Sequence, residues 1–111
     1  MALAYAELKQ KDQTEKLLKQ VVEINPSHER AYYNLSIIYA ERNQLDEAIK
    51  FVSRSEQINP TIPDYPYLRA TLHLRQDDKT KAFEACRTVL GINRNYQPAI
   101  NLIRTIGNPN Q

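Results

Sequence analysis

Apolar residues recur along most of the chain at intervals of three and four positions, the spacing of one face of an α-helix. The pattern is clearest between residues 28 and 60, where two apolar stripes follow each other: Leu35 with Tyr39, then Ala48 with Val52. Asn43-Gln44 separates the stripes. Asn59-Pro60 ends the second one, because proline cannot continue a helical hydrogen-bond ladder. This stretch therefore predicts two helices folded back on each other.

The helix pair is repeated at a fixed distance along the chain. Ile24-Asn25-Pro26, Ile58-Asn59-Pro60 and Ile92-Asn93-Arg94 recur at a constant interval. A period of about 34 residues in helix pairs is typical of a solenoid built from stacked repeats. We expect about seven helices and no strand, with the helices near residues 2–10, 12–24, 28–42, 45–58, 65–76, 79–91 and 96–106.

The central repeat resembles the tetratricopeptide repeat (TPR) family, whose motif places Trp, Leu, Gly, Tyr, Ala, Phe and Pro at set spacing. The matching residues are Tyr32, Leu35, Ser36, Tyr39, Ala48, Val52 and Pro60. The third repeat matches more weakly, through Ala70, Ala82 and Cys86, with Arg69 and His73 off the pattern. The resemblance implies an all-α fold, a right-handed superhelix of antiparallel helix pairs (a TPR-like α-solenoid).

We expect one domain over residues 1–111, with repeat units near 1–26, 27–60 and 61–94 and a terminal helix at 96–106. Aligned on the repeat period, residues 1–11 correspond to 35–45 and begin partway along a helix. This alignment leads us to expect that the chain is part of a larger protein. Residues at the motif positions should be nearly buried: Tyr32, Leu35, Tyr39, Ala48, Val52 and Ala82.

Composition and charge exclude several classes of function. A chain of 111 residues with 41% hydrophobic and 25% charged residues suits one folded domain rather than a disordered segment. The net charge of +2 is too small to indicate binding to nucleic acid or to an anionic membrane. No apolar run approaches the ~20 residues of a membrane span, and the first residues do not resemble a signal peptide. The compartment remains unknown.

The chemistry-bearing residues do not form a catalytic or metal-binding pattern. Cys86, the only cysteine, lies between apolar neighbours and is interpreted as a small buried hydrophobe. His28 stands at a helix-capping position, and His73 has no Cys or His at metal-ligand spacing. Gly91 and Gly107 are the only glycines, so a phosphate-binding loop is not expected. We expect a protein that is not an enzyme and uses no cofactor.

The TPR resemblance implies a concave groove, lined by the first helix of each pair, that binds a protein or peptide partner. Carried over residue by residue, it gives these groove residues: Arg30, Tyr33, Asn34, Ile37, Glu41, Tyr67, Thr71 and Arg75, with Asp64 and Leu68 beside them. Tyrosine suits such a groove because it is large, apolar in its body and polar at its tip. The alternative is that Tyr33 and Tyr67 only pack at the rim.

TPR co-chaperones hold the acidic C-terminus of heat-shock chaperones with a clamp of Lys, Asn and Arg residues. Asn34 matches one of them, but Asp64 and Leu68 stand where the third repeat of that clamp has Lys and Arg. An acid at this place repels a docking carboxylate. We therefore expect no acidic-tail carboxylate clamp.

Two other functions remain open. The first is self-association as a homo-oligomer through the terminal helix, whose apolar residues cover a wide arc and make Leu102 and Ile106 edge contacts. The second is RNA binding, because pentatricopeptide repeats resemble this pattern at a nearby period. The small net charge makes RNA the less favoured partner.

Overall fold

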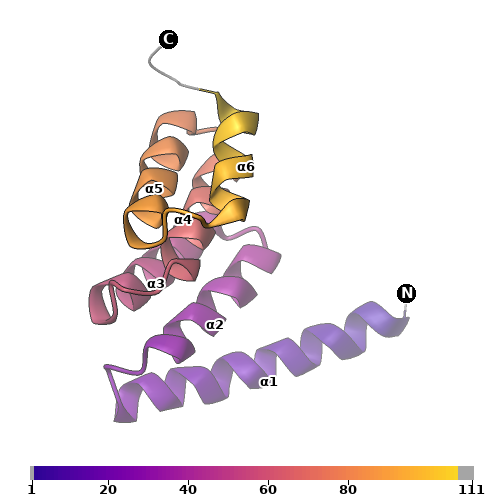
Figure 1. The fold of residues 1–111 in the computed structure, drawn as a ribbon. Helices are drawn as coiled ribbons and strands as arrows, with labels where there is room; N and C mark the ends of the chain where they lie inside the picture. The colour runs from indigo at the N-terminus through magenta and orange to yellow at the C-terminus, as the bar shows by residue number, and fades with distance from the viewer. Residues whose placement is uncertain (1, 108–111) are drawn as a thin grey trace.

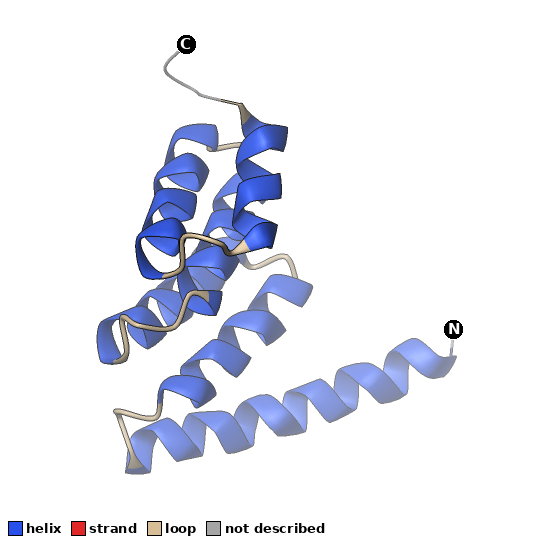
Figure 2. Cartoon of the chain, viewed as in Figure 1, coloured by secondary structure: helices blue, strands red, loops and turns tan. Residues whose placement is uncertain are grey.

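The computed structural model describes the backbone of residues 2–107 and the side chains of residues 8–107. This part of the chain forms six α-helices and no strand (Figure 2). The helices are α1 (Ala2–Ile24), α2 (Glu29–Glu41), α3 (Leu45–Ile58), α4 (Asp64–Arg75), α5 (Lys79–Ile92) and α6 (Gln97–Ile106). α2 pairs with α3 and α4 with α5, α6 packs on α5, and the N-terminal part of α1 extends away from this stack (Figure 1).

The five helices from α2 to α6 confirm the predicted pairs, but the prediction of two helices in residues 2–24 is wrong. The α2–α3 and α4–α5 turns place Asn43 and Asp77 at φ of 62° and 61°. One repeat before Asn43, the same position holds Lys9. A lysine resists positive φ and lacks the short polar side chain that helps Asn and Asp adopt it. The helix therefore continues through Lys9, and α1 is a single element.

Small buried residues hold α2 against α3. Ser36 stands where the TPR motif has glycine, and its Oγ donates a hydrogen bond of 2.6 Å to the carbonyl of Ala48. The Oγ of Ser55 donates to the carbonyl of Glu29 at 2.9 Å. Both serine side chains are fully buried, so these bonds satisfy hydroxyls that water cannot reach. Four of the predicted core residues are also fully buried: Leu35, Ala48, Val52 and Ala82.

The prediction that Tyr32 and Tyr39 are nearly buried is wrong, because both side chains are only half-buried. Tyr32 stacks on Phe51 with the ring centroids 6.3 Å apart. Tyr39 packs on the same ring at 5.2 Å, and its hydroxyl donates to Glu15 of α1. A tyrosine buries its ring while its hydroxyl keeps a polar partner, so these tips stay near the surface.

Polar side chains cap two of the helices. Nδ1 of His28 accepts a hydrogen bond of 3.2 Å from the backbone N–H of Ala31, which confirms the predicted capping position at the start of α2. Asp78 accepts one of 3.1 Å from the N–H of Lys81 at the start of α5. Each bond satisfies a backbone donor that the first turn of a helix leaves free.

Candidate functional site

Helices α2 and α4 lie beside each other and run in the same direction. Near their N-terminal ends, the Tyr65 hydroxyl donates a hydrogen bond of 2.8 Å to Oε2 of Glu29. Near their C-terminal ends, Nη2 of Arg75 donates to the carbonyl of Ala40 and to Oδ1 of Asn43, both at 3.1 Å. The predicted groove residues on α2 and α4 therefore belong to neighbouring helices of successive repeats.

Two tyrosines predicted for the groove lie in aromatic pairs at the N-terminal ends of these helices. The ring of Tyr33 on α2 is 5.2 Å from that of Tyr65, at an interplanar angle of 45°. The guanidinium of Arg30 lies 5.1 Å from the centroid of the Tyr33 ring, within the range of a cation–π interaction. The ring of Tyr67 on α4 is 5.6 Å from that of Tyr96.

Asp64 connects these pairs. Its Oδ1 accepts a hydrogen bond of 2.8 Å from the hydroxyl of Tyr96. Burial and this carboxylate raise the pKa of Tyr33, against the opposing charge of Arg30. Burial is the largest cause, and the hydrogen bond to Asp64 the next, of a rise in the pKa of Tyr96 to about 12. Both phenols therefore remain protonated at neutral pH. We call the group of Arg30, Tyr33, Asp64, Tyr67 and Tyr96 the aromatic surface.

The other predicted groove residues differ in their surroundings. Asn34 is exposed and Ile37 half-buried on α2. Thr71 is half-buried on α4, and its hydroxyl donates to the carbonyl of Leu68 at 2.7 Å. Glu41 forms an ion pair with Lys11 of α1. Glu41 and Arg75 thus connect neighbouring helices at the far end of α2 and α4, whereas Arg30, Tyr33 and Tyr67 lie together.

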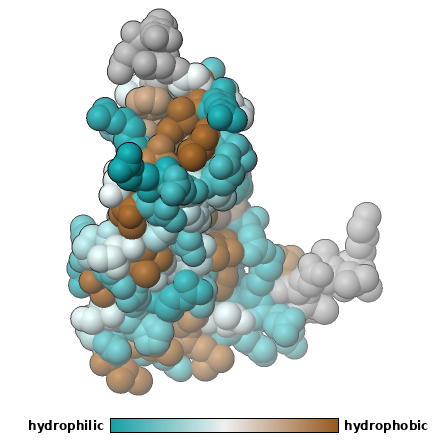
Figure 3. Space-filling view, in the orientation of Figure 1, coloured by the Kyte–Doolittle hydropathy of each residue, from teal (hydrophilic) through white to brown (hydrophobic). Residues whose placement is uncertain are grey.

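The predicted edge residues Leu102 and Ile106 are both half-buried. With Ile103 they pack against a buried cluster of Ala70, Ala85 and Cys86 from α4 and α5. Hydrophobic side chains reach the surface between hydrophilic ones in the upper part of the molecule, where α5 and α6 lie (Figure 3). The side of α6 that packs against α4 and α5 is therefore covered within the same chain.

Sequence reasoning missed Tyr96 as a member of the aromatic surface. Tyr33 and Tyr67 are one full period apart and share one position of the repeat, but Tyr96 follows Tyr67 by less than a period. A search by period therefore passes over Tyr96, which stands at the start of α6. The sequence does place Tyr96 directly before α6, the helix that packs beside α4, and this position is the feature that could have indicated it.

The described residues contain no group of three or more His, Cys, Asp or Glu side chains arranged to hold a metal ion. The single thiol, Cys86, is buried, and burial raises its pKa, so the unreactive protonated form predominates at neutral pH. No described helix combines the length and the hydropathy that a membrane span requires.

These features define an α-helical repeat protein with an aromatic surface on the first helices of its pairs. A family model described as Tetratricopeptide repeat matches residues 5–72, which is more than half of the chain. The chain therefore belongs to the tetratricopeptide repeat family. No curated protein matches the sequence.

Solved structures of similar fold include TPR proteins. YrrB, a TPR protein with an unusual peptide-binding site, is 20% identical with a TM-score of 0.79 over 89% of this chain and 51% of its own. The first TPR of Spaghetti (RPAP3), bound to an HSP90 peptide, is 16% identical with a TM-score of 0.81 over 93% and 82%. MamA from Desulfovibrio magneticus RS-1 is 26% identical with a TM-score of 0.73 over 83% and 52%. The chain thus spans about half the length of YrrB and of this MamA.

Proposed function

We propose that this chain is a non-catalytic interaction module that binds a peptide or an extended segment of a partner protein along α2 and α4. The observation that carries this proposal is the aromatic surface. Tyr33 and Tyr67 occupy one repeat position on neighbouring parallel helices, and each is half-buried. Asn34, Ile37 and Thr71 continue the same binding surface toward the C-terminal ends of the two helices.

The chemistry of these side chains suits a peptide. Tyrosine offers a large contact area while few bond rotations have to be fixed on binding, which is why aromatic residues carry much of the affinity at protein interfaces. The protonated phenol of Tyr33 is able to donate a hydrogen bond to a backbone carbonyl of an extended segment, whereas the Tyr96 hydroxyl already donates to Asp64. Arg30 and Asp64 add one charge of each sign, so the surface distinguishes partners by the charge next to their anchoring side chain.

Two proteins of the same fold support the proposal by what they bind. YrrB has a peptide-binding site, and the first TPR of Spaghetti (RPAP3) holds an HSP90 peptide. Their sequence identities of 20% and 16% make them evidence for the fold, so the partner of this chain has to be found by experiment.

The test is a selection of linear peptides from a random display library on the immobilised chain. The affinity of an enriched peptide is then measured by fluorescence polarisation. Tyr33→Ala and Tyr67→Ala should each weaken binding about fivefold or more, the loss expected for an aromatic anchor worth about 1 kcal/mol. The matched control is Tyr32→Ala, since Tyr32 is adjacent to Tyr33 but packs on Phe51 instead. Equal affinities in all four proteins would refute the proposed surface.

A second candidate function is self-association through α6. Its support is the half-buried state of Leu102 and Ile106, which leaves apolar surface at the end of the stack. Light scattering at micromolar concentration measures the mass directly. A dimer that Ile106→Glu dissociates, while Thr105→Glu on the exposed side of α6 does not, would support this candidate. A monomeric wild-type protein would remove it.

A further inference from the structure

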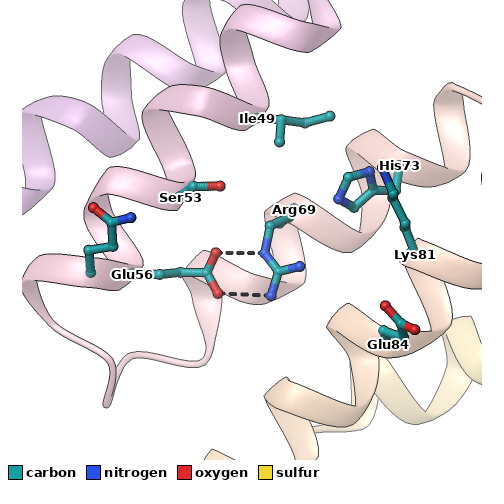
Figure 4. Close-up of a pocket in the computed structure, with 8 residues that line it drawn as sticks. Ile49, Ser53, Glu56, Arg69, His73, Lys81 and Glu84 are labelled. Atoms are coloured by element: carbon teal, nitrogen blue, oxygen red, sulfur yellow. Dashed lines mark hydrogen bonds and ion pairs between the residues drawn. The ribbon is translucent and has the colours of Figure 1, made fainter.

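A pocket of about 550 Å³ lies between α3, α4 and α5 (Figure 4). Its walls include Ile49 and Ser53 of α3, Arg69 and His73 of α4, and Lys81 and Glu84 of α5. Arg69 and His73 each lie two positions beyond Tyr67 and Thr71. At about 100° per residue, that step turns a side chain to the opposite side of the helix. The pocket and the aromatic surface therefore occupy opposite faces of α4.

The repeat explains why this pocket exists. Between α1 and α3, the corresponding space holds the rings of Tyr39 and Phe51, whose centroids are 5.2 Å apart. One repeat later, the chain has His73 in place of Tyr39 and Ala85 in place of Phe51. Ser53 likewise replaces Lys19 on the facing helix. Ala85 belongs to a buried cluster that α6 covers, so the smaller side chains that line the pocket are His73 and Ser53. They leave space between α3 and α5 where the Tyr39 ring lies one repeat earlier.

One wall of the pocket is a guanidinium group in a fixed orientation. Nε of Arg69 donates to Oε2 of Glu56 at 2.6 Å and Nη2 donates to Oε1 at 3.1 Å, as the two dashed lines in Figure 4 show. Such a two-point ion pair holds the guanidinium plane in place, and an aromatic ring stacks favourably on that plane. In the neighbouring space, the guanidinium of Arg42 lies 5.7 Å from the Tyr39 ring.

His73 gives the pocket an unsatisfied polar group. Its residue surface is 8% exposed, and its Nδ1 atom is buried without a hydrogen-bond partner. In Figure 4 its ring lies between Ile49 of α3 and Lys81 of α5. Burial lowers the pKa of His73, and the charges of Arg69 and Lys81 lower it further, so the ring is neutral at neutral pH. Nδ1 itself is closed to the pocket. The other ring nitrogen, Nε2, is not closed off in this way and has no hydrogen bond within the described residues, so a hydroxyl group brought into the pocket is able to pair with it.

We propose that the pocket between α3, α4 and α5 binds the side chain of a tyrosine from a partner polypeptide. The ring takes the space that the Tyr39 ring fills in the preceding repeat and stacks on the guanidinium of Arg69. The hydroxyl pairs with the imidazole of His73. Three tyrosines of this chain already bond to acidic side chains, namely Tyr39, Tyr65 and Tyr96, so Glu84 at the rim offers the hydroxyl a second acceptor. This is a second binding site, separate from the aromatic surface.

The test uses three blocked tripeptides, acetyl-Gly-Xaa-Gly-amide with Xaa as tyrosine, phenylalanine or leucine, titrated into the ¹⁵N-labelled chain. The tyrosine peptide should shift the amide signals of Ser53, Arg69 and His73 with saturation. The phenylalanine peptide should bind about fivefold more weakly because it cannot satisfy His73, and the leucine peptide more weakly still. Equal binding of the tyrosine and leucine peptides, or no shift at these residues, would overturn the proposal.

Single substitutions locate the binding. His73→Tyr restores the residue of the preceding repeat and should fill the pocket and abolish the shifts. Ser53→Lys introduces at the rim of the pocket the residue type that the preceding repeat has there, Lys19. This substitution should weaken binding without changing the buried core. His73→Phe should remove the preference for tyrosine over phenylalanine. Tyr33→Ala, on the opposite face, should leave tripeptide binding unchanged, so this site and the proposed function fail independently. Unaltered binding in both His73→Tyr and Ser53→Lys would contradict the proposed pocket.

Discussion

The hydroxyl of Tyr39 on α2 donates a hydrogen bond of 2.5 Å to Oε2 of Glu15 on α1. Glu15 also forms ion pairs with Arg42 at 2.7 Å and with Lys19 at 2.9 Å. The Tyr39 hydrogen bond, together with those two cations and against the opposing effect of burial, lowers the pKa of Glu15 from 4.5 to about 2. One carboxylate therefore joins the long first helix to the helix pairs that follow it.

The stability of the fold should fall as the pH decreases from about 4.5 to about 2 because of Glu15. A carboxyl group whose pKa is lower in the folded state contributes its full stabilisation above the unfolded pKa. That contribution is lost as the pH falls toward the folded pKa. Urea unfolding at a series of pH values should show this decrease in the wild type and a smaller one in Glu15→Gln. Tyr39→Phe should lose about 1 kcal/mol or more at pH 7. Identical pH profiles for the wild type and Glu15→Gln would contradict this interpretation.

The continuity of α1 should depend on the residue at position 9. Lys9 occupies the position that holds Asn43 and Asp77, both at positive φ, in the two following repeats. Lys9→Gly gives this position easy access to positive φ and costs about 1 kcal/mol of helix propensity relative to alanine. The ¹³Cα chemical shifts of residues 8–11 should lose their helical values in Lys9→Gly and keep them in Lys9→Ala. Helical shifts in both variants would show that the residue at position 9 does not determine whether α1 is continuous.

Ala48 should not tolerate a larger side chain. It is fully buried, and its carbonyl accepts the Ser36 hydrogen bond that brings α2 close to α3. Ala48→Leu should overpack this crossing and lower the free energy of unfolding by about 1–3 kcal/mol. The control is Glu47→Leu, which adds the same side chain at an exposed position of α3. Equal melting temperatures for the wild type and Ala48→Leu would contradict the packing of this helix pair.

The chain should not bind the HSP90 peptide SRMEEVD that occupies the first TPR of Spaghetti (RPAP3). The TPR resemblance aligns Asp64 with a basic residue of the acidic-tail clamp, and the Asp64 carboxylate already accepts a hydrogen bond from the Tyr96 hydroxyl. Calorimetric titration should give no binding stronger than about 1 mM for the wild type. Asp64→Lys should bind the peptide more tightly than the wild type, since it removes a like charge. Micromolar binding by the wild type would contradict the expectation that the clamp is absent.

The sequence predicted most of the fold because its repeat signals are local. Proline after Asn25 and Asn59 marks two helix ends, and Asn43 marks the turn between α2 and α3. Each signal acts through its own backbone geometry, which nearby residues dictate. The prediction of two helices in place of α1 was wrong because the residue at the predicted turn does not suit it. The repeat period predicts a turn at Lys9, but a lysine resists the positive φ that this turn requires.

The sites were harder to predict because they depend on contacts between repeats. The period placed Tyr33 and Tyr67 on neighbouring helices, but Tyr96 joins them only through the packing of α6 beside α4. Arg69 and His73 depart from the TPR motif in the sequence itself. The pocket that these residues line becomes apparent only when the Tyr39 ring of the preceding repeat is located in space and compared with His73. A motif mismatch is visible in the sequence, but the volume it leaves is not.

The most direct test of the proposed function is an NMR map of a display-selected peptide bound to the ¹⁵N-labelled chain. We expect amide shifts to concentrate in the first turns of α2 and α4, around Tyr33 and Tyr67, and to fade toward Glu41 and Arg75. The amide of Phe51 on α3 should stay unchanged, because its ring packs on Tyr32 and Tyr39 and not on the aromatic surface. Shifts confined to α3 and α5, or to the outer face of α6, would contradict binding at the aromatic surface.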